Sequence, residues 1–371
     1  MNMKKILFAL FCAASVFAVS CSKDSGFEIK RGTNISHWLS QCGRFNEERA
    51  TKYFTEQDIK NLHDCGFDHL RIPIDEMVMW DRDGNKVEGA WTLLRNAVEW
   101  CQKYDMRSII DLHILRSHSF IDVAGRNTLF TSEEEQDKLI GLWYEISDRF
   151  KDVPVKDLAY EFLNEPIAPE HSQWNALVAK VHKALREREP KRVLVIGSNN
   201  QQSYSTVKYL EVPENDPNII LSFHFYHPMM VTHYQAMWCD MRVCKGPVHY
   251  PGKLITDEEF AELSDEDKVI LKEFNEEWDK ERLHDMMKDA IETAKKFNLQ
   301  LFCGEWGVYD RCPSEAKYAW YKDMISIFDE FDVAWTTWDY KDSFGFWKPD
   351  GSGFSDKEML DILMSGQPLK K

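Results

Sequence analysis

Eight short apolar runs alternate with amphipathic segments along this chain, and this alternation constrains the fold more than any other feature. The runs are almost continuously hydrophobic, which is typical of parallel strands buried on both faces of a sheet. The intervening segments have helical spacing and helix signals, such as a capping box at Thr55 and Asp58 and a helix end at Gly66. The pattern predicts an α/β protein folded as a (β/α)8 TIM barrel. The expected strands are residues 27–36, 67–74, 106–113, 157–166, 191–198, 219–228, 298–307 and 334–341.

A doubly wound open sheet is the alternative arrangement for such a pattern. No glycine-rich phosphate-binding motif follows any of the expected strands, which argues against a nucleotide-binding sheet. At about 150 residues per domain, the length would suggest two or three domains, but the repeats favour one barrel over residues 27–371. After the sixth strand, residues 227–264 are expected to form a long ordered loop at a barrel mouth. The acidic stretch 265–297 is expected to be a mostly solvated helix.

The amino terminus resembles a bacterial lipoprotein signal. Two lysines precede an apolar run over residues 6–19, which is too short to span a bilayer comfortably but suits a signal peptide. Small residues then lead to Cys21, with Ala18 where leucine is usual. We expect residues 1–20 to be a signal peptide and residues 21–26 to be a lipidated cysteine with a short tether. The chain would be an exported outer-membrane lipoprotein, with cell-surface exposure left open; a plain secretory signal is the alternative.

The charge balance excludes one class of partner. The chain has 46 Lys and Arg residues against 62 Asp and Glu residues, a formal charge of −16, and no basic run occurs. We therefore expect no nucleic-acid partner. Contact with a membrane is expected only through the lipid anchor, and the chain is expected to be a monomer.

The cysteines leave two possibilities open. An exported protein permits a disulfide between Cys239 and Cys244, which lie in one loop. A zinc site is the alternative, but the sequence contains no tight pairing of ligands. We therefore expect no metal and no cofactor. The histidines near Cys239 and Cys244 that this zinc alternative would use are His227, His233 and His249.

Polar side chains stand near the carboxyl ends of seven expected strands, within otherwise apolar runs. In a barrel these strand ends face the active site, and burying many polar groups costs free energy unless they are paired or used. Two of these groups, Glu165 and Glu305, end strands on opposite sides of the ring and can face each other across the mouth. Glycoside hydrolysis needs such a pair of carboxylates. The full set is Asn34, Arg71, His113, Asn164, Glu165, His224, Tyr226, Glu305 and Trp338.

The motifs that contain these residues resemble glycoside hydrolase family 5, the cellulase-type family of retaining (β/α)8 enzymes. The tripeptide NEP is weak by itself, but the ordered set, with each member on its expected strand, is specific. The resemblance covers residues 27–365. The motifs are RGTN (31–34), LRIP (70–73), DLH (111–113), NEP (164–166), HFY (224–226), GEWG (304–307) and Trp338.

The resemblance implies a double displacement with Glu165 as general acid/base and Glu305 as nucleophile. It implies that Asn164 binds the sugar 2-hydroxyl, and that Arg71 and Tyr226 lie near Glu305 and keep it ionised, since a nearby cation lowers a carboxylate pKa. The other substrate-binding residues that it implies are His113, His224 near the acid/base, Trp338 beneath the sugar, and Asn34. A structural ion pair, a core histidine and core packing are the alternative interpretations of Arg71, His113 and Trp338.

The leading hypothesis is a retaining endo-β-1,4-glucanase that acts on a β-glucan polysaccharide or oligosaccharide. Alternatives within the family are β-mannanase, xyloglucanase, exo-β-1,3-glucanase and glycolipid hydrolase. A non-catalytic surface glycan-binding lipoprotein and a metal hydrolase that uses His and Glu are alternatives of other classes. Residues 114–120 and 227–264 depart from the family pattern beside the cleft, so the substrate is left open.

Four tryptophans near strand ends or in mouth loops are candidates for outer sugar subsites, because planar rings can stack on sugars. The alternative is that they pack beneath loops. They are Trp38, Trp238, Trp306 and Trp347.

Overall fold

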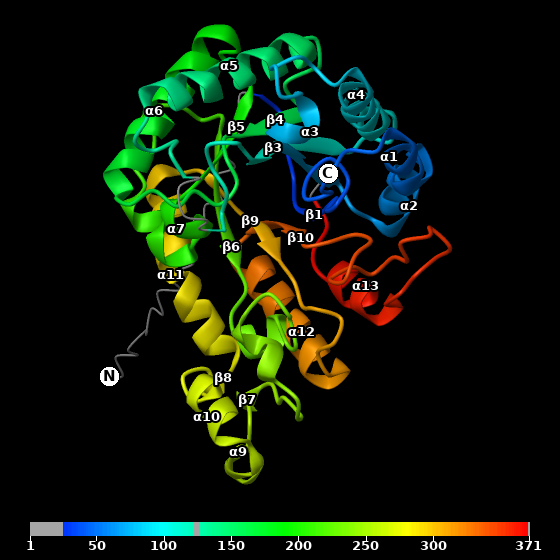
Figure 1. The fold of residues 1–371 in the computed structure, drawn as a ribbon, viewed down its shortest axis with the longest axis vertical. Coiled ribbons are helices and arrows are strands. Elements are labelled where there is room, and N and C mark those ends of the chain that lie inside the picture. Colours follow the sequence, from blue (N-terminus) through cyan, green and yellow to red (C-terminus); the bar gives the residue numbers. More distant parts are fainter. Residues whose placement is uncertain (1–24, 122–126, 370–371) are drawn as a thin grey trace, which may run out of the picture.

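A computed structural model describes residues 25–121 and 127–369; the predicted signal peptide and the lipidation at Cys21 lie outside these ranges. Eight parallel strands close into a barrel in the spatial order β1-β10-β9-β6-β5-β4-β3-β2 (Figure 1). The predicted (β/α)8 fold is confirmed, and every strand overlaps its expected run. The strands are β1 (Arg31–Asn34), β2 (His69–Asp75), β3 (Arg107–Ile114), β4 (Leu158–Glu161), β5 (Val193–Gly197), β6 (Ile219–Phe225), β9 (Gln300–Trp306) and β10 (Ala334–Thr337).

Helices surround the barrel, and capping residues in the sequence determine where they begin and end. A reciprocal capping box joins Thr55 and Asp58 at the start of α2, and Gly66 ends the helix with a left-handed φ of 97°. The main helices each bury part of their surface. They are α1 (Glu47–Tyr53), α2 (Glu56–Cys65), α3 (Glu76–Met79), α4 (Glu88–Lys103), α5 (Glu133–Phe150), α6 (His171–Arg188), α11 (Lys280–Phe297), α12 (Ser314–Glu330) and α13 (Lys357–Met364).

The connection from β5 to β6 departs from the predicted strand–helix alternation. It contains the short turn α7 (Asn199–Gln202) and the 3₁₀ helix η1 (Tyr204–Tyr209) in place of a long α-helix. The backbone of α7 is left-handed, with φ of 60° at Asn200 and 59° at Gln201. Helix α11 packs against η1 and covers this side of the barrel.

The segment between β6 and α11 is a larger insertion than predicted. It contains α8 (Met229–Thr232), η2 (Asp240–Val243), α9 (Asp257–Glu262) and α10 (Asp265–Leu271), with β7 (Gly252–Lys253) paired antiparallel to β8 (Glu277–Trp278). Figure 1 shows β7, β8, α9 and α10 extending from one side of the barrel.

The prediction of one solvated helix over residues 265–297 was wrong. The chain breaks after α10, and α11 begins anew at Lys280; the N-cap residue Asp279 accepts a hydrogen bond from the Arg282 backbone N–H. Helix α11 is also not mostly solvated, because residues such as Leu283 and Met287 are buried. Charged residues dominate the composition of this stretch and hide the apolar face.

The segment before β1 closes the amino-terminal end of the barrel. Phe27 and Ile29 are buried in a cluster with residues near the starts of several strands, including Val193 and Ala334. The Ser25 backbone already donates to the Asn218 side chain at 3.1 Å. Packing against the barrel therefore begins within the predicted tether, at the end opposite the strand carboxyl ends.

Candidate active site

Arg71 on β2 is the centre of a buried charge cluster at the carboxyl ends of the strands. Its guanidinium has no exposed surface and contacts Asp111 on β3 at 3.0 Å, Glu161 on β4 at 2.7 Å and Glu305 on β9 at 2.8 Å. One cation is therefore shared among three carboxylates from three other strands. Such a cluster is stable only while the cation is present, because an uncompensated buried charge costs several kcal/mol, about 3–5 for one broken pair.

Glu305 lies within β9, and its two carboxylate oxygens have different partners. Arg71 donates to Oε1, and the Tyr226 hydroxyl donates to Oε2 at 3.2 Å. His224 is the register partner of Glu305 on the neighbouring strand β6. The structure thus places both residues predicted beside Glu305 at hydrogen-bond distance.

Glu165 faces Glu305 from the other side of the mouth. It lies beyond the end of β4, in a loop where its own φ is 45°, rather than at the last strand position. His224 Nδ1 lies 2.9 Å from Glu165 Oε1. One oxygen of each glutamate and one ring nitrogen of His224 lie within 4.8 Å of one another. This close approach agrees with the ~5–5.5 Å separation of the two carboxyl groups in retaining glycosidases.

Neighbouring charges separate the pKa values of the two glutamates, both of which burial raises. It raises the pKa of Glu165 well above its usual range, and the neighbouring charge of Glu305 adds to this effect. Burial also raises the pKa of Glu305, although Arg71 opposes the change. Arg71 offsets burial only in part because Asp111 and Glu161 share it, and the pKa of Asp111 rises to about 7. The proton therefore belongs on Glu165 and the negative charge on Glu305.

We expect Tyr226→Phe to shift the acid limb of the kcat/KM profile to higher pH. The hydroxyl stabilises ionised Glu305, so its removal raises that pKa further; a hydrogen bond to a charged group contributes about 1.5–3 kcal/mol, or roughly one to two pH units. The profile should be measured on a soluble aryl β-cellobioside. Tyr250→Phe, which removes a hydroxyl of the insertion that donates to Asp323 on α12, is the control. An unmoved acid limb would contradict this assignment.

Asn164 is fixed by the same arginine and keeps one donor free. Its Oδ1 accepts from Arg71 Nη2 at 2.9 Å, and its buried Nδ2 has no hydrogen-bond partner in the protein. An amide donor at this position suits a sugar hydroxyl, so the predicted contact with the 2-hydroxyl stays a prediction with a geometric basis.

His113 and Trp338 form one side of the mouth. Their rings stack with centroids 5.7 Å apart and an interplanar angle of 10°. His113 Nδ1 lies 2.7 Å from Asp111, and its Nε2 lies 2.8 Å from Gln41. Burial lowers the pKa of His113 to about 4, so its ring is neutral near pH 7. Trp338 is half-buried and can present its free face to a ligand.

Asn34 lies beneath the site, which corrects its predicted contact with substrate. It has no exposed surface, its Nδ2 donates to the Gly304 and Thr337 carbonyls at 3.0 and 3.1 Å, and its Oδ1 accepts from Arg71. Every polar atom of its side chain is paired within the protein. Asn34 therefore orients Arg71, and Arg71, which is equally buried, acts on a sugar only through Glu305 and Asn164.

Sequence reasoning missed Asp111 and Glu161 as members of the site. Asp111 stands in the DLH motif, and Glu161 stands within the fourth apolar run. Each is an acidic residue inside a buried strand, which is a costly position without a cation. That cost is the signal that could have identified both as partners of Arg71.

Three of the four tryptophans considered for outer sugar subsites are buried, as the alternative interpretation allowed. Trp38 and Trp306 have no exposed surface, and Trp347 has 9%. The Trp38 indole donates to the Ala50 carbonyl at 2.9 Å, in the core. Position near a strand end does not reveal whether a large ring turns toward the mouth or packs beneath the adjoining loop.

Trp238 differs from the other three because 60% of it is exposed. Trp238 lies in the insertion. Its ring packs edge-to-face with the ring of Tyr309, which follows β9, and the two ring centroids are 5.1 Å apart. Phe344 lies 6.3 Å from it and also 6.3 Å from Tyr226 of the catalytic set. Trp238 is thus separated from the reaction centre by a single layer of aromatic rings.

The seven cysteines in the described ranges carry free thiols, including Cys239 and Cys244. The histidines considered for zinc have other partners: His249 contacts Glu259, His227 stacks on Trp278, and His233 lies against Tyr226. Within residues 25–121 and 127–369, one set of three possible ligands comes close together. This set is Glu165, His224 and Glu305, the same groups that a glycosidase mechanism uses.

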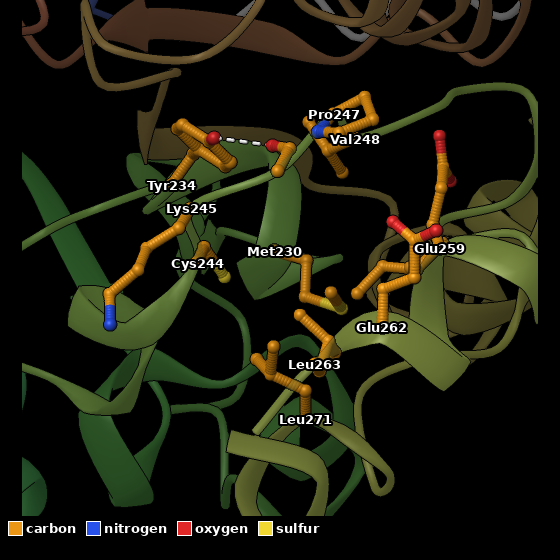
Figure 2. A pocket seen from close by; sticks show the side chains of 12 residues that line it. Met230, Tyr234, Cys244, Lys245, Pro247, Val248, Glu259, Glu262, Leu263 and Leu271 are labelled. Carbon is orange, nitrogen blue, oxygen red and sulfur yellow. Dashed lines mark hydrogen bonds between the residues drawn. The ribbon is translucent and has the colours of Figure 1, made fainter.

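A separate hollow lies inside the insertion (Figure 2). Its volume is about 240 Å³, and Met230, Leu263 and Leu271 give it an apolar floor. Glu259 and Glu262 stand at its edge on α9. Its lining shares no residue with the catalytic set.

A closed (β/α)8 barrel with two facing carboxylates at its mouth is the arrangement that a glycoside hydrolase uses. Comparison with known proteins gives the family. A family model described as Cellulase (glycosyl hydrolase family 5) matches residues 25–344. The chain belongs to glycosyl hydrolase family 5.

Individual relatives agree with this assignment. Endoglucanase C of Acetivibrio thermocellus is 32% identical over 338 residues, which cover 90% of this chain and 97% of that protein. Cellodextrinase A of Ruminococcus flavefaciens is 29% identical over 307 residues, covering 82% and 84%. The solved endoglucanase Cel5A of Thermotoga maritima has a TM-score of 0.70 at 21% identity, covering 90% and 96%, and it is similar in fold.

Proposed function

We propose that the protein is a retaining endo-β-1,4-glucanase. Glu305 attacks the anomeric carbon, and the bond to the leaving oxygen breaks as that oxygen takes the proton of Glu165. Water then attacks the glycosyl–Glu305 ester, losing its proton to Glu165 and releasing Glu305. The observation that carries the proposal is the close approach of the two carboxylates, within 4.8 Å, with the higher pKa on Glu165.

The remaining roles follow from the contacts. Arg71 and Tyr226 hold the two oxygens of Glu305, and His224 holds Glu165. Asn164 offers a free donor to the sugar. Every step uses side chains of this chain, without a cofactor.

The substrate assignment rests on relatives whose names state their activities. Endoglucanase C aligns with this chain over nearly its whole length, which supports internal cleavage of a β-1,4-glucan. Cellodextrinase A, at slightly lower identity, supports the same linkage in shorter chains. Polymer and oligosaccharide substrates must therefore be compared directly.

Viscosity and reducing ends, measured together, test this function. On soluble β-1,4-glucan we expect a rapid fall in viscosity with few new reducing ends, unchanged by a chelator. Release of short sugars at constant viscosity would show exo action. Activity confined to β-mannan, xyloglucan or β-1,3-glucan would show that this polysaccharide, rather than β-1,4-glucan, is the substrate. Loss of activity with chelator would favour a metal hydrolase, and binding without turnover would favour a glycan-binding protein.

We also propose Trp238 as a sugar-stacking platform outside the catalytic subsite. Its exposed ring packs edge-to-face with the ring of Tyr309. Trp238→Ala should raise KM for cellohexaose about three- to tenfold, as expected from an aromatic contact of about 0.5–1.5 kcal/mol, with a smaller change for an aryl cellobioside. Tyr209→Ala, at another exposed ring on η1, is the control. Equal changes on both substrates would contradict the platform.

Finally, we propose export as a monomeric outer-membrane lipoprotein anchored through Cys21. Support comes from the signal-like amino terminus and from Phe27, which packs into the barrel end opposite the mouth. An anchor there would direct the mouth away from the membrane. Among the described residues, the helices are all too short or too polar to cross a bilayer. Cys21→Ala should release the enzyme from the membrane fraction; retention would contradict anchoring at this residue.

A further inference from the structure

Gln202, in the turn after β5, binds both the segment of the general acid and the Arg71 cluster. Its amide is fully buried. Oε1 accepts from the Glu165 backbone N–H at 2.8 Å, and Nε2 donates to Glu161 Oε1 and Ser222 Oγ, each at 3.1 Å. This position therefore requires an acceptor at one end and a donor at the other, which an amide provides. A carboxylate would fit less well, because it would place a second negative charge beside Glu161.

The backbone at both ends of this contact is held in an unfavourable conformation. Glu165 has a φ of 45°, and Asn200, Gln201 and Gln202 have φ of 60°, 59° and 52°. A left-handed backbone is unfavourable for a residue with a side chain, because Cβ comes too close to the following carbonyl oxygen. Such conformations persist where surrounding contacts fix them, and they cluster at functional sites.

Further hydrogen bonds join the same two segments. Gln201 N donates to the Pro166 carbonyl at 3.0 Å. The Asn199 side chain accepts from Ala168 N at 2.8 Å and donates to Ala168 O at 2.9 Å. The turn therefore binds this loop at Glu165 and again at Ala168.

Gly197, the last residue of β5, makes room for this arrangement. A Cβ at this position would lie 2.3 Å from Cγ and Nε2 of Gln202. Any larger residue at this position must displace the Gln202 side chain. The strand end and the turn are thus matched to place one amide.

We propose that Gln202 is a positioning residue for general acid catalysis. This inference rests on the proposed role of Glu165. By fixing the Glu165 amide, Gln202 sets the direction in which the carboxyl group leaves the backbone and keeps its proton aimed at the leaving oxygen. A displacement of about 1 Å at such a group can cost 100-fold in rate.

Leaving-group dependence tests this role. A 2,4-dinitrophenyl leaving group departs without a proton, whereas phenol needs the general acid. For Gln202→Met and Gly197→Ala, kcat/KM should fall about 10- to 100-fold on phenyl β-cellobioside and by less than about threefold on the dinitrophenyl substrate. The ratio of the two values within one preparation is independent of the folded fraction, so partial misfolding does not mimic the effect.

Two further variants separate the possible failures. Glu165→Gln should show the same selectivity with a larger loss, about 10²- to 10⁴-fold, and absence of that selectivity would overturn the role of Glu165 itself. Asn200→Gly keeps a left-handed residue and removes an exposed side chain, so it should keep the wild-type ratio. The positioning role alone would be overturned if Glu165→Gln showed this selectivity but the Gln202 and Gly197 variants did not. Those variants would then lose activity equally on both substrates, or lose none.

Discussion

Glu305→Ala is expected to lower kcat on soluble β-1,4-glucan by about 10⁵-fold, because removal of a catalytic nucleophile eliminates the covalent route. Glu305 is 6% exposed and contacts Arg71 and Tyr226, so loss of its carboxylate leaves a small polar space beside these two residues. Initial rates at matched protein concentration measure the effect. Glu214→Ala, at an exposed glutamate remote from the site, should keep the wild-type rate.

Azide distinguishes a lost nucleophile from a damaged fold. The small anion can enter the space left in Glu305→Ala and attack a dinitrophenyl β-cellobioside from the face that Glu305 used. We expect partial recovery of turnover and an α-glycosyl azide product. Recovery with a β-azide, or full activity of the variant without azide, would contradict Glu305 as the nucleophile.

Arg71→Met is expected to give the largest loss of stability, about 3–5 kcal/mol in the free energy of unfolding at pH 7.5. The variant leaves Asp111, Glu161 and Glu305 buried without their shared cation. Burial then holds their folded-state pKa values above those of the unfolded chain, so the folded state binds more protons and regains stability as the pH falls. The deficit relative to wild type should therefore be smaller at pH 5 than at pH 7.5.

Urea unfolding at the two pH values measures this deficit. Arg95→Met is the matched control, since Arg95 bridges Glu99 and Asp152 at the surface and such pairs contribute about 0–1 kcal/mol. A deficit in Arg71→Met no larger than in the control, or one that grows as the pH falls, would contradict the charge cluster described above.

The sequence predicts the barrel and the catalytic pair because both follow from local patterns. Eight apolar runs predict eight buried strands, and parallel strands bring their carboxyl ends to one mouth. Glu165 and Glu305 therefore meet even though 140 residues separate them along the chain. The proximity of Arg71 and Tyr226 to Glu305 follows in the same way.

Depth along a strand and the direction of a side chain do not follow from such patterns. Asn34 ends its strand as predicted but lies beneath the mouth, and Trp306 lies beside Glu305 in sequence but faces the core. Gln202 lies in a polar turn with no periodic signal, and its principal contact is to a backbone amide. Contacts of this kind depend on how two loops meet, which the sequence pattern does not specify.

The anomeric configuration of the first-formed product tests the central claim most directly. Proton NMR during the early hydrolysis of cellopentaose, before mutarotation, reports whether the newly released reducing end is α or β. Two displacements at one carbon, by Glu305 and then by water, predict the β anomer. An α anomer as the first product would show a single displacement by water and would contradict the account.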